Sequence, residues 1–226
     1  MARFQHLHPW DLSPSEAVAL QRELSSRVRI EPPVGRIRTV AGCDLSFNRF
    51  EERVFAGIVV LAWPSLETIE EVAVETVSRF PYVPGLLSFR ETPALLEAWA
   101  KLETEPDAVV LDGQGLAHPR RMGIACHFGL LVDRPTVGCA KSPLAGKFEE
   151  PGPNRGDESP VVLGGEVVGA AVRNKRGSNP LIVSPGHLCD VETAVTIVLE
   201  GDAGYRIPEP TRRAHLLVNE HRRAAR

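Results

Sequence analysis

Three apolar segments joined by short connections restrict the fold of this chain more than any other feature. They cover residues 37–47, 54–63 and 69–77, with one turn expected over residues 48–52 and another at Pro64 and Ser65. Segments of this length that are rich in β-branched residues and separated by tight turns form successive antiparallel strands. The first third of the chain is therefore expected to contain a three-stranded antiparallel meander.

The rest of the chain alternates between helical and strand-like patterns. The sequence predicts helices over residues 13–29, 88–102, 122–132, 191–199 and 211–222, and strands over residues 108–111, 135–140, 161–172 (a hairpin turning near Gly164 and Gly165) and 181–184. A meander followed by alternating strand and helix is typical of an α/β fold. With 226 residues and no internal repeat, we expect one domain over residues 1–226, a mixed β-sheet flanked by helices.

Composition and charge limit the partners and the compartment. The formal net charge of −3 gives no global positive field, although basic residues gather at residues 120–121, 173–176 and 206–226. The N-terminus lacks an apolar signal core, and no apolar run approaches the length of a membrane span. We expect a cytoplasmic protein with no membrane partner. The four cysteines form no C-x-x-C pair, which favours buried, reduced thiols.

Acidic residues occur inside or just after apolar segments at Asp44, Glu91 and Asp112. Carboxylates are rarely buried unless they are paired, hydrogen-bonded or bound to a metal. Asp44 and Asp112 would meet if their strands are neighbours in the sheet. A cluster of hard oxygen ligands selects Mg²⁺ or Mn²⁺, ions that serve phosphate chemistry. The spacing also allows a structural interpretation, in which Asp44 bonds a turn and Glu91 completes a capping box with Ser88.

Three basic side chains each have a functional and a structural interpretation. Lys141 follows an apolar strand, where it is either solvated or placed to offset charge that builds on a phosphate. His118 could transfer protons or bond a backbone carbonyl, and His215 is equally ambiguous. Asp190 fits a helix cap better than a metal ligand.

The segment from residue 80 to 85 holds an aromatic side chain, Tyr82, between Pro81 and Pro84. Such a rigid aromatic can act as a wedge that replaces a displaced base and stacks on its neighbour. Alternatively, Tyr82 covers the core from a packed loop.

Taken together, these residues resemble the endonuclease V family of deoxyinosine-directed repair nucleases, which have an RNase H-like fold. The resemblance runs in order over most of the chain. Its motifs are VAGCDLSF (residues 40–47), PYVPGLLSFRE (81–91), DGQGLAHPR (112–120), GCAKS (138–142) and YRIPEPTRRAH (205–215).

The resemblance implies a role for each candidate residue. Asp44, Glu91 and Asp112 would form a Mg²⁺ centre, with Mn²⁺ as a substitute, and His118, Lys141 and His215 would support catalysis. Tyr82, held by Pro81 and Pro84, would be the wedge. The pocket for a flipped hypoxanthine would be lined by Gly85, Leu87, Gly113, Ile124 and Ala140.

The implied activity is hydrolysis of the second phosphodiester bond 3′ to deoxyinosine in DNA, leaving 3′-hydroxyl and 5′-phosphate ends. The alternatives are an inosine-specific endoribonuclease, a non-catalytic protein that binds inosine-containing DNA, and a metal-dependent nucleotide phosphatase. A pure binder has no need of the acidic residues with Lys141, and a phosphatase has no use for the Tyr82 wedge. The sequence does not predict any protein partner.

Overall fold

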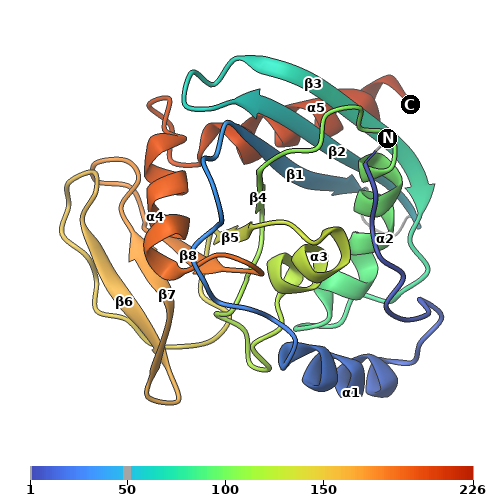
Figure 1. The fold of residues 1–226 in the computed structure, drawn as a ribbon, viewed down its shortest axis with the longest axis horizontal. Helices are drawn as coiled ribbons and strands as arrows, with labels where there is room; N and C mark the ends of the chain where they lie inside the picture. The colour runs from blue at the N-terminus through green and yellow to red at the C-terminus, as the bar shows by residue number, and fades with distance from the viewer. Residues whose placement is uncertain (1, 48–51, 226) are drawn as a thin grey trace.

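The structure of the protein is a computed structural model that describes residues 2–47 and 52–225. Most of the turn expected over residues 48–52 lies outside this range. One eight-stranded sheet organises the chain, in the order β3-β2-β1-β4-β5-β8-β7-β6 (Figure 1). The strands are β1 (Thr39–Phe47), β2 (Arg53–Ala62), β3 (Thr68–Val77), β4 (Ala108–Leu111), β5 (Thr136–Ala140), β6 (Glu158–Leu163), β7 (Glu166–Val172) and β8 (Leu181–Pro185).

The first five strands have the arrangement expected of an RNase H-like fold. β1, β2 and β3 pair antiparallel, which confirms the predicted meander. β4 then adds to the free edge of β1 in parallel, and β5 adds to β4 in parallel. β8, β7 and β6 extend the sheet by antiparallel pairing, and β6 and β7 form the predicted hairpin. The sheet is therefore mixed, as the sequence predicted.

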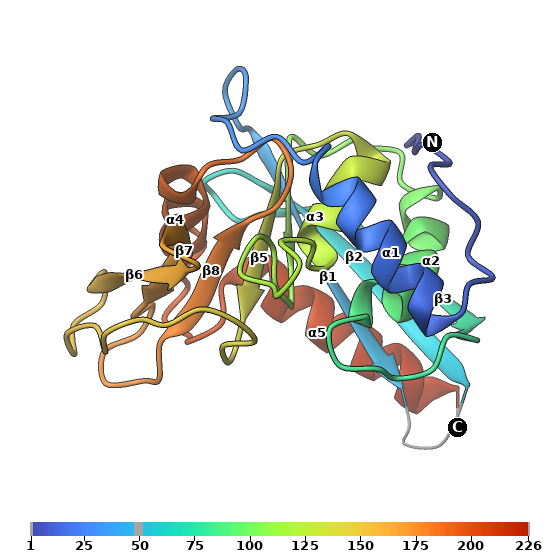
Figure 2. The ribbon, with the colours of Figure 1, turned by 90° about the horizontal axis from the view of Figure 1, so that it is seen from below.

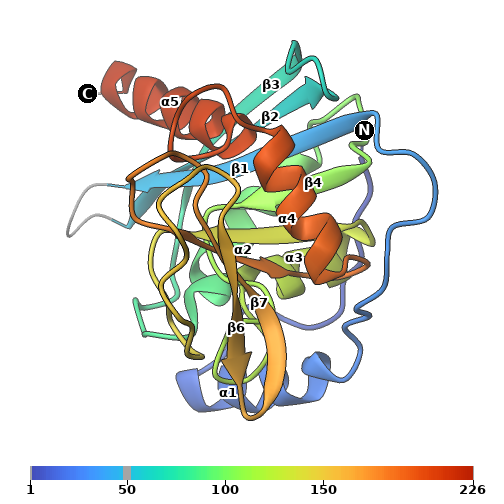
Figure 3. The same cartoon turned by 90° about the vertical axis from the view of Figure 1, so that its left-hand side faces the viewer.

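Helices cover both faces of the sheet (Figures 2 and 3). They are α1 (Pro14–Ser25), α2 (Leu87–Trp99), α3 (Ile124–Val132), α4 (Val191–Glu200) and α5 (Glu209–Ala224). Alternate residues of a strand face opposite sides of a sheet. Accordingly, Ala41 and Cys43 of β1 pack in a core with α2 and α3, whereas Val40 packs in a second core with α4. β1 is thus a central strand, buried on both faces.

α5 lies against β1 and β2 because two glycines allow close approach. A Cβ at Gly42 would lie 1.9 Å from the Pro210 carbonyl oxygen, and one at Gly57 would lie 2.5 Å from Cγ1 of Val218. Gly42 shares a face of β1 with Asp44 and Ser46, because these positions are two residues apart. The side chains of Asp44 and Ser46 therefore meet successive turns of α5.

Helix ends follow local capping chemistry, with shifts of a few residues from prediction. Ser13 and Glu16 form a capping box at the start of α1. The Asp190 side chain accepts from Thr193 N–H at the start of α4, which confirms the helix cap predicted for Asp190. α1 ends earlier than predicted, at Ser25, and α5 starts earlier, at Glu209. The four cysteines are buried and unpaired, as expected. No helix in the described part of the chain is long and apolar enough to cross a membrane.

Candidate active site

Two neighbouring parallel strands bring Asp44 and Asp112 together. The last pair in the ladder between β1 and β4 is Cys43 with Leu111, so Asp44 and Asp112 occupy the next positions on adjacent strands. Their side chains are 11% and 22% exposed, respectively. The two strands are therefore neighbours, which was the condition for Asp44 and Asp112 to meet, and this pairing places two carboxylates at one end of the central sheet.

Glu91 joins this pair from α2, and its predicted capping role is wrong. α2 begins at Leu87, its N-cap is Leu86, and no side chain caps it. Gly85 has φ of +78°, which lets the chain turn into the helix before Ser88. Ser88 is thereby buried inside the first turn, and the Glu91 carboxylate is close enough to Asp44 and Asp112 to feel both charges.

Crowding and burial raise the proton affinity of two carboxylates at this site, those of Asp44 and Glu91. Burial, together with the charges of Asp44 and Asp112, raises the pKa of Glu91 to about 8. Burial and the charge of Asp112 raise the pKa of Asp44 to about 6, although His215 opposes this. Such a cluster is electrostatically unfavourable without a nearby cation. A divalent cation would supply that charge.

Lys141 supplies part of the missing positive charge. It follows β5 and forms an ion pair with Asp112. Burial acts to lower the pKa of Lys141, but Asp112 and Asp44 outweigh it and raise the pKa, so the ammonium is retained. Arg206 holds this segment in place, because its Nη2 donates to the Lys141 carbonyl at 2.8 Å. Arg206 was not predicted, although it lies in the last of the sequence motifs.

His215 reaches the site from α5, and its tautomer follows from its neighbours. Its Nδ1 lies 2.7 Å from Oδ2 of Asp44, and its Nε2 lies 3.0 Å from Nδ2 of Asn219. The guanidinium of Arg222 can only donate, and it contacts Oδ1 of Asn219 at 3.0 Å, so the Asn219 amide nitrogen faces His215. Nε2 of His215 therefore accepts, and Nδ1–H donates to Asp44.

The carboxylate oxygens of these residues are suitable ligands for a hard divalent cation, although their present positions do not form a complete coordination site. Within residues 2–47 and 52–225, no three His, Cys, Asp or Glu side chains are gathered closely enough to hold an ion as they stand. Lys141 and His215 occupy carboxylate oxygens of Asp112 and Asp44. Metal binding thus requires small side-chain movements. A bound cation would offset the mutual repulsion of the carboxylates that raises the pKa values of Asp44 and Glu91.

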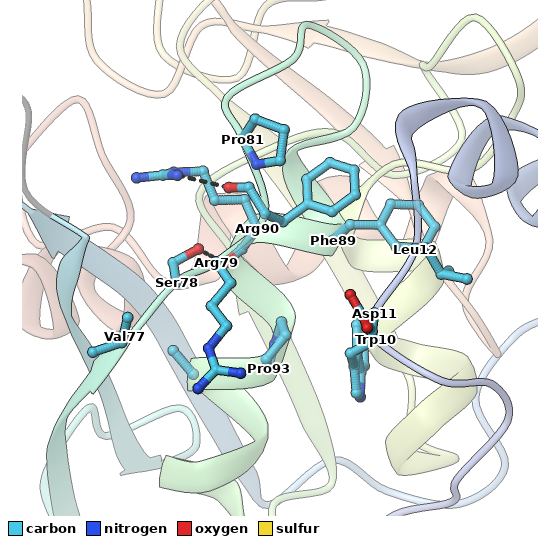
Figure 4. A pocket seen from close by; sticks show the side chains of 12 residues that line it. Trp10, Asp11, Leu12, Val77, Ser78, Arg79, Pro81, Phe89, Arg90 and Pro93 are labelled. Atoms are coloured by element: carbon cyan, nitrogen blue, oxygen red, sulfur yellow. Dashed lines mark hydrogen bonds between the residues drawn. The ribbon is translucent and has the colours of Figure 1, made fainter.

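The loop from β3 to α2 presents Tyr82 to solvent. Phe80 anchors the loop, because it is buried and its ring lies 5.6 Å from that of Phe89. Nη1 of Arg90 donates to the Phe80 carbonyl at 2.8 Å (Figure 4). Tyr82 is 69% exposed, so the interpretation that it covers the core is wrong.

Pro81 and Pro84 on either side of Tyr82 are also exposed. Pro81 lines a cavity of about 360 Å³ together with Arg79, Arg90 and Trp10, whose side chains are labelled in Figure 4. Arg90 is a support for the loop that sequence reasoning missed.

A smaller cavity lies behind this loop and gathers most of the residues predicted to surround a base. Its lining includes Gly85, Leu87 and Ile124. Gly113 stands directly behind Ile124, because a Cβ there would lie 2.6 Å from Cγ2 of Ile124. Ala140 is not among the lining residues and packs in a separate apolar cluster. The cavity measures about 40 Å³, room for at most a few water molecules.

His118 belongs to this small cavity. Its Nε2 lies 3.0 Å from the Gly85 carbonyl, and its Nδ1 accepts from Arg120 N–H at 3.2 Å, so Nε2 carries the proton. Burial lowers the pKa of His118 to about 4, which keeps the ring neutral. Its contacts match the structural interpretation, that of a histidine bonding a backbone carbonyl.

Further side chains at the small cavity have no counterpart in the sequence prediction. Gln21, Ser88 and Gln114 are buried and line it, and no sequence pattern marks them as site residues. His187 lies elsewhere, with Nδ1 accepting from Arg29 N–H at 3.2 Å and Nε2 3.7 Å from Asp133.

Comparisons with known proteins agree on one family. Residues 22–216 match the family model described as Endonuclease V. Endonuclease V of Myxococcus xanthus is 49% identical over 225 residues, covering 99% of this chain and 96% of the relative. The crystal structure of Endonuclease V from Streptomyces avermitilis superposes with a TM-score of 0.90 at 40% identity, covering 96% of each chain.

A more distant relative was solved with nucleic acid. Endonuclease V of Ciona intestinalis, in complex with a 23mer DNA containing an inosine followed by a ribo-adenosine, superposes with a TM-score of 0.81 at 26% identity. That comparison covers 95% of this chain and all of the relative. With matches of this extent, the chain belongs to the endonuclease V family.

Proposed function

We propose that this chain is a Mg²⁺-dependent endonuclease that recognises deoxyinosine in DNA and hydrolyses the second phosphodiester bond on the 3′ side, leaving 3′-hydroxyl and 5′-phosphate ends. The observation that carries the proposal is the meeting of Asp44, Glu91 and Asp112 with Lys141 at one end of the sheet. Family membership and the inosine-containing DNA bound by the Ciona intestinalis relative support the substrate. We further propose that the protein acts in the cytoplasm.

The carboxylates are the residues that would hold the ion. Asp44 and Asp112 stand side by side on parallel strands, and Glu91 adds a third carboxylate from α2. When bound, Mg²⁺ supplies Lewis-acid stabilisation of the phosphate that is attacked. His215 fixes one oxygen of Asp44 through Nδ1–H, which orients the other oxygen. Asn219 in turn fixes the histidine ring.

Lys141 is the group in this chain that can offset charge at the reacting phosphate. Its ammonium is retained, and its side chain is 44% exposed, so a phosphate oxygen can approach it. A positioned cation of this kind stabilises negative charge that develops in the transition state. Because Arg206 bonds the Lys141 carbonyl, the backbone that carries this lysine is fixed.

The loop and the small cavity supply a lesion-recognition site. Tyr82 is exposed at the tip of a loop that Phe80 and Arg90 anchor, as a wedge between bases requires. The flipped hypoxanthine would enter the cavity of Gly85, Leu87 and Ile124, with Gly113 behind it. Since the cavity is small, base entry requires the lining to open. Leu144 also lines the cavity and is 45% exposed, so it stands on the solvent side of the lining.

The test is nicking of matched duplexes that carry inosine or adenine at one position, with Mg²⁺ or with EDTA. We expect cutting of the inosine strand only, and only with Mg²⁺. Asp44→Asn should abolish nicking but retain binding of inosine DNA, because it removes an anionic ligand and no base contact. Asp190→Asn is the matched control, since asparagine caps a helix as well as aspartate does. Substantial nicking by Asp44→Asn would refute the metal centre.

A further inference from the structure

The small cavity contains two buried polar atoms without a hydrogen-bond partner. Gln114 is 7% exposed and Ser88 is 2% exposed, and both line the cavity. Oε1 of Gln114 and Oγ of Ser88 have no partner among the described residues. A buried polar group without a partner is destabilising, so such groups mark a place where a ligand supplies the missing bonds. The cavity therefore suits a polar ligand with a matching edge.

The orientation of the Gln114 amide is fixed by its other contact. Nε2 of Gln114 donates to the Ser142 carbonyl at 2.9 Å. A carbonyl oxygen can only accept, so the amide nitrogen must face Ser142 and Oε1 must face away from it. Gln114 thus presents a fixed acceptor, whereas the Ser88 hydroxyl can rotate to donate or to accept.

The start of α2 presents the opposite kind of group to the same cavity. Leu87 and Ser88 are the first two residues of the helix and both line the cavity. Backbone N–H groups in the first turn have no acceptor within a helix, and no side chain caps this one. The residues that line the cavity therefore offer backbone donors at the start of α2 as well as the fixed acceptor of Gln114.

We propose that Gln114 determines base specificity, with its Oε1 accepting a hydrogen bond from the ring N1–H of a flipped hypoxanthine. This inference rests on the proposed function and names a residue for its recognition step. The base oxygen at position 6 would then face the donors of α2. Adenine inverts both groups: its N1 is a bare acceptor opposite Oε1, and its amino group is a donor opposite the α2 N–H groups. The cavity rejects adenine because fixed groups cannot rotate to suit it.

The test compares the preference for inosine over adenine in two variants of the same cavity. Gln114→Met keeps the length of the side chain and removes the acceptor. Gln21→Met is the matched control, because Gln21 is also buried there but its amide is fully engaged: Nε2 donates to the Gly85 and Met122 carbonyls, both at 3.0 Å, and Oε1 accepts from Nε of Arg120 at 2.6 Å.

The measurement is competition binding of matched inosine and adenine oligonucleotides in EDTA, which removes the chemical step. We expect the preference for inosine to fall about tenfold or more in Gln114→Met, the usual effect of an unpaired buried group. In Gln21→Met, any loss should affect both oligonucleotides equally. If thermal unfolding shows that Gln114→Met is not folded, Gln114→Asn is used in its place. The shorter side chain withdraws the acceptor from the base and should also lower the preference for inosine.

The possible failures are distinguishable. An unchanged preference in Gln114→Met or its replacement, or an equal fall in Gln21→Met, would overturn the role of Gln114 while leaving the nuclease intact. Wild-type protein that neither prefers nor cuts inosine DNA would instead refute the proposed function.

Discussion

Replacing Glu91 by glutamine should stabilise the metal-free protein while removing its response to Mg²⁺. The pKa of Glu91 is raised from 4.5 to about 8, mainly by burial and by the charges of Asp44 and Asp112. A pKa difference of one unit between the folded and the unfolded chain corresponds to about 1.4 kcal/mol. Because the pKa is higher in the folded chain, the free-energy cost of ionising Glu91 grows as the pH rises from about 4.5 to about 8.

The full displacement sets an upper limit of about 5 kcal/mol on that cost. The site is partly open to solvent, which screens the charges, so at pH 8 we expect Glu91→Gln to gain about 2–4 kcal/mol in EDTA. The assay is urea unfolding at pH 8 with EDTA and with Mg²⁺. Wild type should gain stability with Mg²⁺, because an ion that binds only the folded state stabilises it. The variant should gain little. A variant that is less stable than wild type in EDTA, or that responds equally to Mg²⁺, would refute this reasoning.

Three further perturbations test other parts of the molecule. Gly113→Val should reduce cutting of inosine DNA but leave Mg²⁺ binding intact, because the new side chain collides with Ile124; an unchanged inosine preference over adenine would place the pocket elsewhere. Tyr82→Ala should weaken binding to inosine duplex by about 1–3 kcal/mol, the worth of a base–aromatic stack, in a gel-shift titration; wild-type binding and cutting would exclude a wedge. Burial, with the charge of His8, lowers the pKa of His127 to about 3. The neutral His127 ring contributes fully to the free energy of unfolding above about pH 6.5, and this contribution decreases as the pH falls towards 3. Between pH 6.5 and pH 5, the free energy of unfolding measured in urea should therefore fall by about 2 kcal/mol less in His127→Phe than in wild type. Equal losses would contradict this assignment.

The centre of the fold and two of its acidic residues could be predicted because local patterns determine them. The run of residues 108–111 is apolar throughout and short, which is typical of a strand buried on both faces. Once it pairs with β1, the register alone brings Asp44 next to Asp112.

The two Ser-x-x-Glu patterns show where local prediction fails. Ser13 and Glu16 form a capping box, whereas Ser88 and Glu91 have the same spacing and do not. The difference lies in Gly85, whose positive φ turns the chain into α2 early and buries Ser88. A pattern of two residues cannot reveal that turn.

Contacts between residues that are distant in the sequence could not be predicted, for a different reason. His215 meets Asp44 because α5 packs closely on Gly42 and Gly57, and this packing joins strand residues to a helix that lies far away in the sequence. Gln114 becomes informative only when its amide nitrogen is seen to be engaged and its oxygen is not. Such roles follow from the assembled fold and not from spacing.

The most direct test of the central claim is to map the cut made by the wild-type protein and Mg²⁺ in matched DNA and RNA oligonucleotides that carry a single inosine. The proposed function predicts one nick in the DNA strand, at the second phosphodiester bond 3′ to inosine, with 3′-hydroxyl and 5′-phosphate ends. Cutting confined to the RNA would indicate an inosine-specific endoribonuclease. Binding to inosine DNA without any cut, or cuts unrelated to the position of inosine, would contradict the account.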